Sequence, residues 1–194
     1  MPSHKIHLGI AQGVNKKLNL DNDSIMLGSI LPDITREQNH GLSHFQYDYI
    51  YPKNLANPDE FMKKYPNMKD DISIGYIIHL LTDRYYNDVY YHTNSEGIEH
   101  NRNFKHNLFA SYDTYLLKHK KIEKFKNINV INNLSSYKDI SFNKKYLKEY
   151  IEKTNNDIDN NQLDNNYYIE HQEFLDKLYK GCIDYIKDNI NNYR

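Results

Sequence analysis

The stretch Gly75–Tyr86 reads GYIIHLLTDRYY and is one of the most apolar runs of a polar chain, yet its interior contains His79 and Asp83. The two residues are four positions apart, which places them on one face of a helix. Burying an imidazole and a carboxylate costs several kcal/mol unless a partner compensates for the lost hydration. Either the two side chains satisfy each other through a hydrogen bond, or both bind something else inside the fold.

The spacing of apolar residues elsewhere also predicts helices. Three- and four-residue spacing recurs along the chain and strict alternation is scarce, which favours an all-α fold. We expect helices over residues 4–18, from residue 70 or 71 to 86 or beyond, over 101–119 and 144–154, and within the C-terminal stretch 164–190, with a short one near 58–65. Pro32 should end the helix that precedes it near Ile30.

Length and composition set the broad class. The 194 residues suit a single compact multi-helix domain spanning 1–194, in which 1–119 contains the histidine-rich helices and 120–194 has no assigned role. A net charge of -1 gives no basic face for duplex nucleic acid. The single Cys182 excludes an internal disulfide framework, and no run has the length of a signal peptide core or a transmembrane segment, so we expect a cytoplasmic protein.

Histidines are abundant and unevenly placed. Nine of the 10 precede residue 120, and imidazole together with carboxylate is the usual ligand set of zinc. His4 and His7 are three apart on the first helix, where both or only one of them would face inward. His40 and His44 have the spacing of metalloprotease helices, but the Glu that should follow the first His is missing, which excludes that class.

Two further pairs extend the pattern. His106 and Asp113 are seven residues apart and therefore lie on one helix face, two turns from each other. His92 follows His79 by 13 positions and would point away from the Asp83 face of an unbroken helix. Either that helix ends near residues 87–88, or His92 belongs to a neighbouring site.

The order of these motifs resembles the zinc-dependent phospholipase C family of bacteria, whose fold is shared with single-strand-specific fungal nucleases. The resemblance spans about residues 1–117 and rests on His7, the segment LGSILPD ending at Asp33, SHF at His44, GYIIHLLTD with His79 and Asp83, then His92 and His106. It implies an all-helical fold with two or three metal ions, usually zinc, close together in a cleft.

The resemblance also implies which residues bind each ion. The first ion would be bound by Asp33, His44, His79 and Asp83. Asp83 would bridge to a second ion that His7 also binds, and a third would take His92 and His106.

The sequence departs from the family pattern in two places. Ala110 stands four residues after His106, where the family has Glu, and Asp113 is the candidate replacement on the same helix face. The secreted phospholipases use their processed N-terminal amine as a ligand, and His4 is the candidate for that position.

The implied reaction is hydrolysis of a phosphodiester or phosphomonoester, with a small molecule or a phospholipid as substrate. Paired metal ions about 3.5–4 Å apart activate a water molecule and stabilise an in-line transition state. Asp33, beside that water, would accept its proton. The alternative is a non-catalytic helical protein that binds metal for stability. An HD-type phosphohydrolase is excluded because no His is followed directly by Asp.

Overall fold

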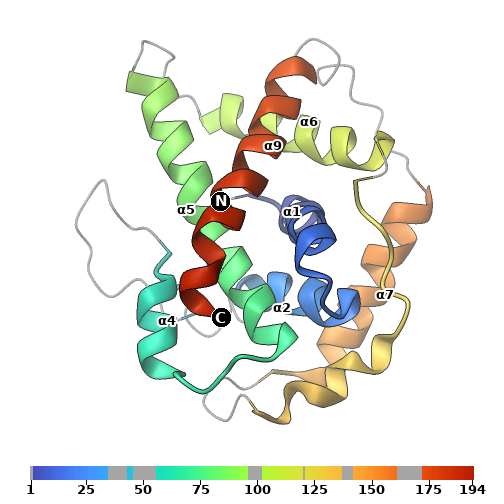
Figure 1. The fold of residues 1–194 in the computed structure, drawn as a ribbon. Coiled ribbons are helices and arrows are strands. Elements are labelled where there is room, and N and C mark those ends of the chain that lie inside the picture. The colour runs from blue at the N-terminus through green and yellow to red at the C-terminus, as the bar shows by residue number, and fades with distance from the viewer. Residues whose placement is uncertain are drawn as a thin grey trace.

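The computed structural model describes residues 2–34, 43–45, 56–95, 102–119, 121–136, 142–160 and 172–194, and its described residues form helices and no strand (Figure 1). The α-helices are α1 (His4–Leu18), α2 (Asn22–Ile34), α4 (Pro58–Lys64), α5 (Asp71–Ser95), α6 (Arg102–Lys118), α7 (Lys144–Asn160) and α9 (Gln172–Asn189), and the 3-10 helices are η1 (Ile128–Ser136) and η2 (Ile190–Tyr193). The all-α prediction is confirmed. Within the described part of the chain, no helix has the length and apolar character needed to cross a bilayer.

Helix α1 is the central element of the fold. Its residues from Ile6 to Asn15 are buried, and it contacts α2, α5, α6 and α9 (Figure 1). Ser3 caps its N-terminus by accepting a hydrogen bond from the Ile6 amide, and Asn19 closes its C-terminus in the left-handed conformation. A helix buried on nearly all sides fixes the direction of its side chains, His7 among them.

Helices α2 and α5 form the most extensive helix–helix contact of the described fold. Their crossing point is Gly28 on α2 and Gly75 on α5, where a Cβ on either residue would lie within 2.3 Å of a carbonyl oxygen of the facing helix. Only glycine permits so close an approach. The C-terminal end of α2 and the middle of α5 are thereby brought together.

One boundary prediction is wrong. Helix α2 continues through Pro32 to Ile34 instead of ending near Ile30, because the burial of Leu31 and Pro32 in the core outweighs the backbone hydrogen bond that the proline removes. Helix α5 runs to Ser95, in agreement with a predicted end at residue 86 or beyond, and this excludes the alternative of an end near residues 87–88. His92 lies within the helix, and side chains between residues 89 and 106 are outside the description.

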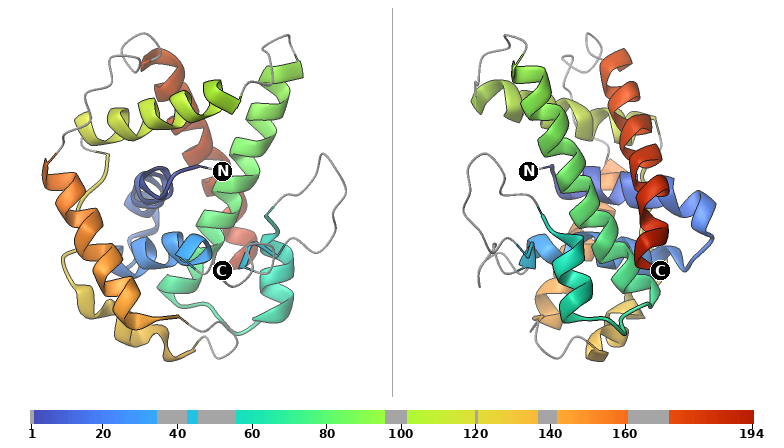
Figure 2. Two further views of the ribbon diagram at one scale, coloured as in Figure 1. Left: turned by 180° about the vertical axis from the view of Figure 1, so that it is seen from behind. Right: turned by 60° about the vertical axis from the view of Figure 1, so that its left-hand side comes forward.

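The C-terminal helices cover the core. Helix α9 packs on α1, α5 and α6, while α7 packs on η1 at the other side of the molecule (Figure 2). Buried Leu175, Cys182 and Ile186 of α9 belong to the same hydrophobic cluster as Ile10 of α1. In this structure residues 172–194 therefore complete the core around α1.

Candidate metal centre

Side chains from four separate segments, α1 among them, converge in the interior of the fold. His7 comes from α1, Asp33 from the last turn of α2, and His79 and Asp83 from the middle of α5. His44 comes from the short described stretch 43–45. The three imidazoles are 0% exposed and Asp83 is 1% exposed, so this group is inside the protein.

The two carboxylates each face imidazoles in two directions. Asp83 Oδ1 lies 3.5 Å from His7 Nε2, whereas Asp83 Oδ2 lies 3.3 Å from His44 Nε2 and 3.5 Å from His79 Nε2. Asp33 Oδ1 is 3.6 Å from His44 Nε2, and its Oδ2 is 4.0 Å from His7 Nε2. Each carboxylate therefore spans from the His7 side of the cluster to the His44 side.

The tautomer of His79 follows from its surroundings. Its Nδ1 lies 2.8 Å from the carbonyl oxygen of Ser29, which only accepts hydrogen bonds, so Nδ1 is the protonated nitrogen that donates. Nε2 of His79 faces Nε2 of His44 at 3.0 Å, and only one nitrogen of that pair can have a proton at such a separation. A histidine whose outer nitrogen donates to a carbonyl presents the inner lone pair in the manner of a metal ligand.

His44 is positioned through its backbone. Its carbonyl accepts a hydrogen bond of 3.0 Å from the Asn57 amide, and the Tyr76 hydroxyl donates to the Ser43 carbonyl at 2.5 Å. The next residue, Phe45, has a φ of 56°, which is uncommon for a residue with a side chain. Its ring is buried against Phe61 and Tyr76, and this packing sustains the strained backbone that turns His44 inward.

Several buried polar atoms of the cluster have no hydrogen-bond partner among the described residues: both ring nitrogens of His7, Oδ1 of Asp33 and both carboxylate oxygens of Asp83. Buried polar groups are nearly always satisfied in folded proteins. Two triads of ligand atoms, His7–His79–Asp83 and Asp33–His44–His79, each lie within 4.8 Å of one another. Ligands about 2.0–2.1 Å from a tetrahedral zinc are about 3.3 Å apart, close to the separations measured here. These residues fit a metal ion.

Burial and neighbouring charges act in opposite directions on the pKa values of the cluster. Burial lowers the pKa of His7 to about 4, with His79 acting in the same direction. Burial would also lower the pKa of His44, but Asp33 and Asp83 outweigh that effect and raise it to about 9. Burial would raise the pKa of both carboxyl groups, yet the surrounding histidines hold the pKa of Asp33 and Asp83 well below the usual range.

The remaining predicted ligands have different positions. His4 lies at the edge of the cluster, with Nε2 3.3 Å from Asp33 Oδ2. Asp113 lies outside the cluster, where its carboxylate accepts a hydrogen bond from the Ser3 hydroxyl, and burial raises its pKa to about 6. The side chains of His92 and His106, and all of His40, fall outside the described residues, so the third metal site stays a prediction.

Sequence reasoning missed the groups that position these ligands. The Ser29 carbonyl that orients His79 is a backbone atom and leaves no mark on residue type. Tyr150, which hydrogen-bonds His4 Nδ1, is 146 positions away in the chain. Neither contact had a local pattern that could have revealed it.

Comparisons with protein-family models, with curated proteins and with solved structures return no match to this chain. The resemblance to the zinc-dependent phospholipases C therefore rests on the order of the motifs.

Proposed function

We propose that this protein is a metal-dependent phosphoesterase with a phospholipase C-like centre, which hydrolyses a phosphodiester or a phosphomonoester. The observation that supports this most directly is the convergence of His7, Asp33, His44, His79 and Asp83, with buried ligand atoms that lack a hydrogen-bond partner among the described residues. Three imidazoles and two carboxylates form a donor set for zinc or a similar divalent transition metal.

The carboxylates support a centre with more than one ion. Asp83 and Asp33 each face His7 with one oxygen and His44 with the other, as a ligand that bridges two ions would. Asp33, His44, His79 and Asp83 would hold one ion, and Asp83 would hold the other together with His7. Paired ions supply Lewis-acid stabilisation of a phosphoryl group and an activated water when they are bound.

Asp33 is the residue we propose as proton acceptor. Its side chain is 6% exposed and adjoins His4, whose side chain is 32% exposed, whereas His7, His44 and His79 are completely buried. The cluster is thus closed on the α5 side and nearest to solvent on the Asp33 side. A substrate would approach there, and the Asp33 carboxylate lies on its path.

The second candidate is a metal-stabilised protein without catalysis. The burial of three imidazoles and of Asp83 favours it, because a structural ion has closed coordination inside the fold. Metal content alone does not separate the candidates, whereas hydrolysis does.

The test has two steps. Mass spectrometry on untagged protein purified without added metal should find two or three zinc-like ions per chain. The same protein should hydrolyse bis(4-nitrophenyl) phosphate or 4-nitrophenyl phosphate, and Asp33→Asn should retain the fold but lose most of that activity. Bound metal with no hydrolysis of either ester, before or after zinc is added, favours the structural role. Folded protein that takes up no zinc contradicts both candidates.

A further inference from the structure

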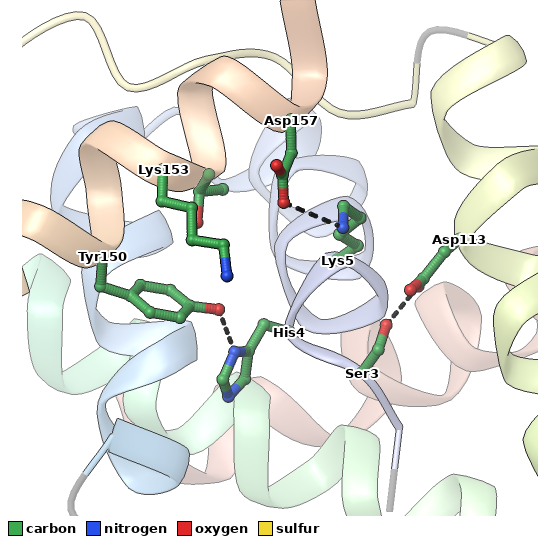
Figure 3. A pocket seen from close by; sticks show the side chains of 8 residues that line it. Ser3, His4, Lys5, Asp113, Tyr150, Lys153 and Asp157 are labelled. Carbon is green, nitrogen blue, oxygen red and sulfur yellow. Dashed lines mark hydrogen bonds and ion pairs between the residues drawn. The ribbon is translucent and has the colours of Figure 1, made fainter. Parts of the chain in front are cut away.

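A small polar pocket adjoins the candidate metal centre. It has a volume of about 250 Å³ and lies between the N-terminal end of α1, helix α6 and helix α7. Figure 3 shows the side chains of Ser3, His4, Lys5, Tyr150 and Lys153 around it. Almost every group that lines it is a hydrogen-bonding or charged group, so its chemistry is that of a binding site for a polar ligand.

His4 separates the pocket from the metal cluster. Its Nε2 is 3.3 Å from Asp33 Oδ2, and its Nδ1 is hydrogen-bonded to the Tyr150 hydroxyl, which belongs to the pocket wall (Figure 3). A molecule bound at Asp33 would therefore need to extend past only the His4 ring to place its other end in this pocket.

The charges in the pocket are unequally compensated. Lys5 Nζ lies 3.5 Å from Asp157 Oδ2, and the Asp113 carboxylate accepts a hydrogen bond from Ser3. Lys153 extends from α7 with its ammonium directed into the pocket, and the described residues give it no ion-pair partner (Figure 3). A cation directed at a polar pocket with both carboxylates already engaged is suited to an anionic ligand.

We propose that this pocket binds a second anionic group of the substrate, with Lys153 as its counter-ion. The substrate is then a small phosphate ester with a second phosphate or a carboxylate, and not a phospholipid. Every side chain that lines the pocket ends in a polar or charged group, and 250 Å³ is below the roughly 300 Å³ at which pockets for larger ligands begin, so the pocket is too small for an acyl chain. This inference rests on the proposed function, because it takes the metal cluster as the site of the ester.

Two probe molecules isolate the second anionic group. 2-Phosphoglycolate and 2-hydroxyethyl phosphate share a phosphate ester on a two-carbon unit, and they differ only in a carboxylate against a hydroxymethyl group. Titration calorimetry on the protein with its bound metal should show 2-phosphoglycolate binding about tenfold more tightly, the effect of one favourable charge-assisted contact.

Lys153→Met should abolish this preference, and Lys153→Glu should reverse it. Lys148→Met is the matched control, because Lys148 is an exposed lysine of the same helix that pairs with Glu152 at 4.0 Å and does not line the pocket. The control should retain the wild-type preference. Lys153 is exposed, so thermal unfolding of its variants should match that of the wild type.

The outcomes separate this inference from the proposed function. A preference lost in Lys153→Met and kept in Lys148→Met supports the pocket even if no ester is hydrolysed, in which case only the phosphoesterase proposal fails. Ester hydrolysis without any Lys153-dependent preference, or no binding of 2-phosphoglycolate at all, overturns the assignment of the pocket.

Discussion

Replacing either crossing glycine by alanine should damage the fold and the metal centre together. A Cβ on Gly28 would lie 2.0 Å from the Ile72 carbonyl oxygen, and one on Gly75 would lie 2.3 Å from the Ile25 carbonyl oxygen. Ordinary contact begins at 3.4 Å, and both obstacles are backbone atoms of a helix that no side-chain rotation can move. Helices α2 and α5 must therefore separate by about 1 Å to accept either substitution.

The magnitude follows from that separation. Overpacking a core costs about 1–3 kcal/mol, and alanine returns up to about 1 kcal/mol through its higher helix propensity. A net loss of about 1–2 kcal/mol lowers the melting temperature of a chain of this length by about 2–8 °C. The metal centre should suffer more, because Asp33 is on α2 while His79 and Asp83 are on α5, and ligand distances tolerate only about 0.2 Å.

The assay compares thermal unfolding and metal content of Gly28→Ala and Gly75→Ala with those of Gly9→Ala. A Cβ on Gly9 would meet only side-chain atoms, at 3.1 and 3.2 Å from Leu116 and 3.4 Å from Ile122, and shifts of a few tenths of an ångström in these side chains relieve the contacts. The control should therefore retain its melting temperature and its metal. If Gly28→Ala also melted at the wild-type temperature with its metal intact, the close crossing would not be what brings the ligands together.

Three further results are expected. His79→Ala should lose most of the bound metal and melt at a lower temperature, because it removes the imidazole shared by both ligand triads. Mass spectrometry would measure the metal and calorimetry the melting temperature, and full metal content would contradict the site. Zinc binding near pH 7.5 should release about one proton from His44, whose pKa is about 9, and this is measured by calorimetry in buffers of different ionisation enthalpy. Protein stripped of metal should lose stability in urea unfolding as the pH rises from about 6.5 towards 9, because folding raises the pKa of His44 to about 9 and its stabilisation is complete only below the unfolded pKa. Below 6.5 the lowered pKa of His7 and the raised pKa of Asp113 act in opposite directions, so we expect little change there. A stability that rose steadily from pH 6.5 to 9 would refute the sign for His44.

The sequence predicted the helices well because they are long and periodic. The first helix has the bounds His4–Leu18 that its spacing indicated, and α5 begins at Asp71 as expected. Helix ends were harder to predict, since the core packing that keeps α2 helical through buried Pro32 leaves no local pattern. Face periodicity also placed His79 and Asp83 together, because that relation is local to one helix.

Relations between segments were beyond local patterns. The entry of His44 depends on Phe45 in a left-handed conformation, which no rule for residues other than glycine anticipates. Asp113 shares a helix with His106, but the packing of that helix directs Asp113 to Ser3, outside the metal cluster. The order of motifs predicted that His7, Asp33 and His44 belong together, whereas the pocket around Lys153 had no motif at all.

The electrostatics of the cluster connect the fold to its proposed chemistry. His44 and His79 face each other through nitrogens 3.0 Å apart, a separation that accommodates one proton, and the neighbouring Asp33 and Asp83 raise the pKa of His44 to about 9. A proton between these two nitrogens occupies the place of a cation that both imidazoles would bind. Proton and metal therefore compete for the same lone pairs, and a divalent ion compensates the two carboxylates more completely than one proton does. Because the proton on His44 partly compensates the two carboxylates, the cluster can be buried before metal binds. Metal affinity should then increase with pH until His44 has lost its proton.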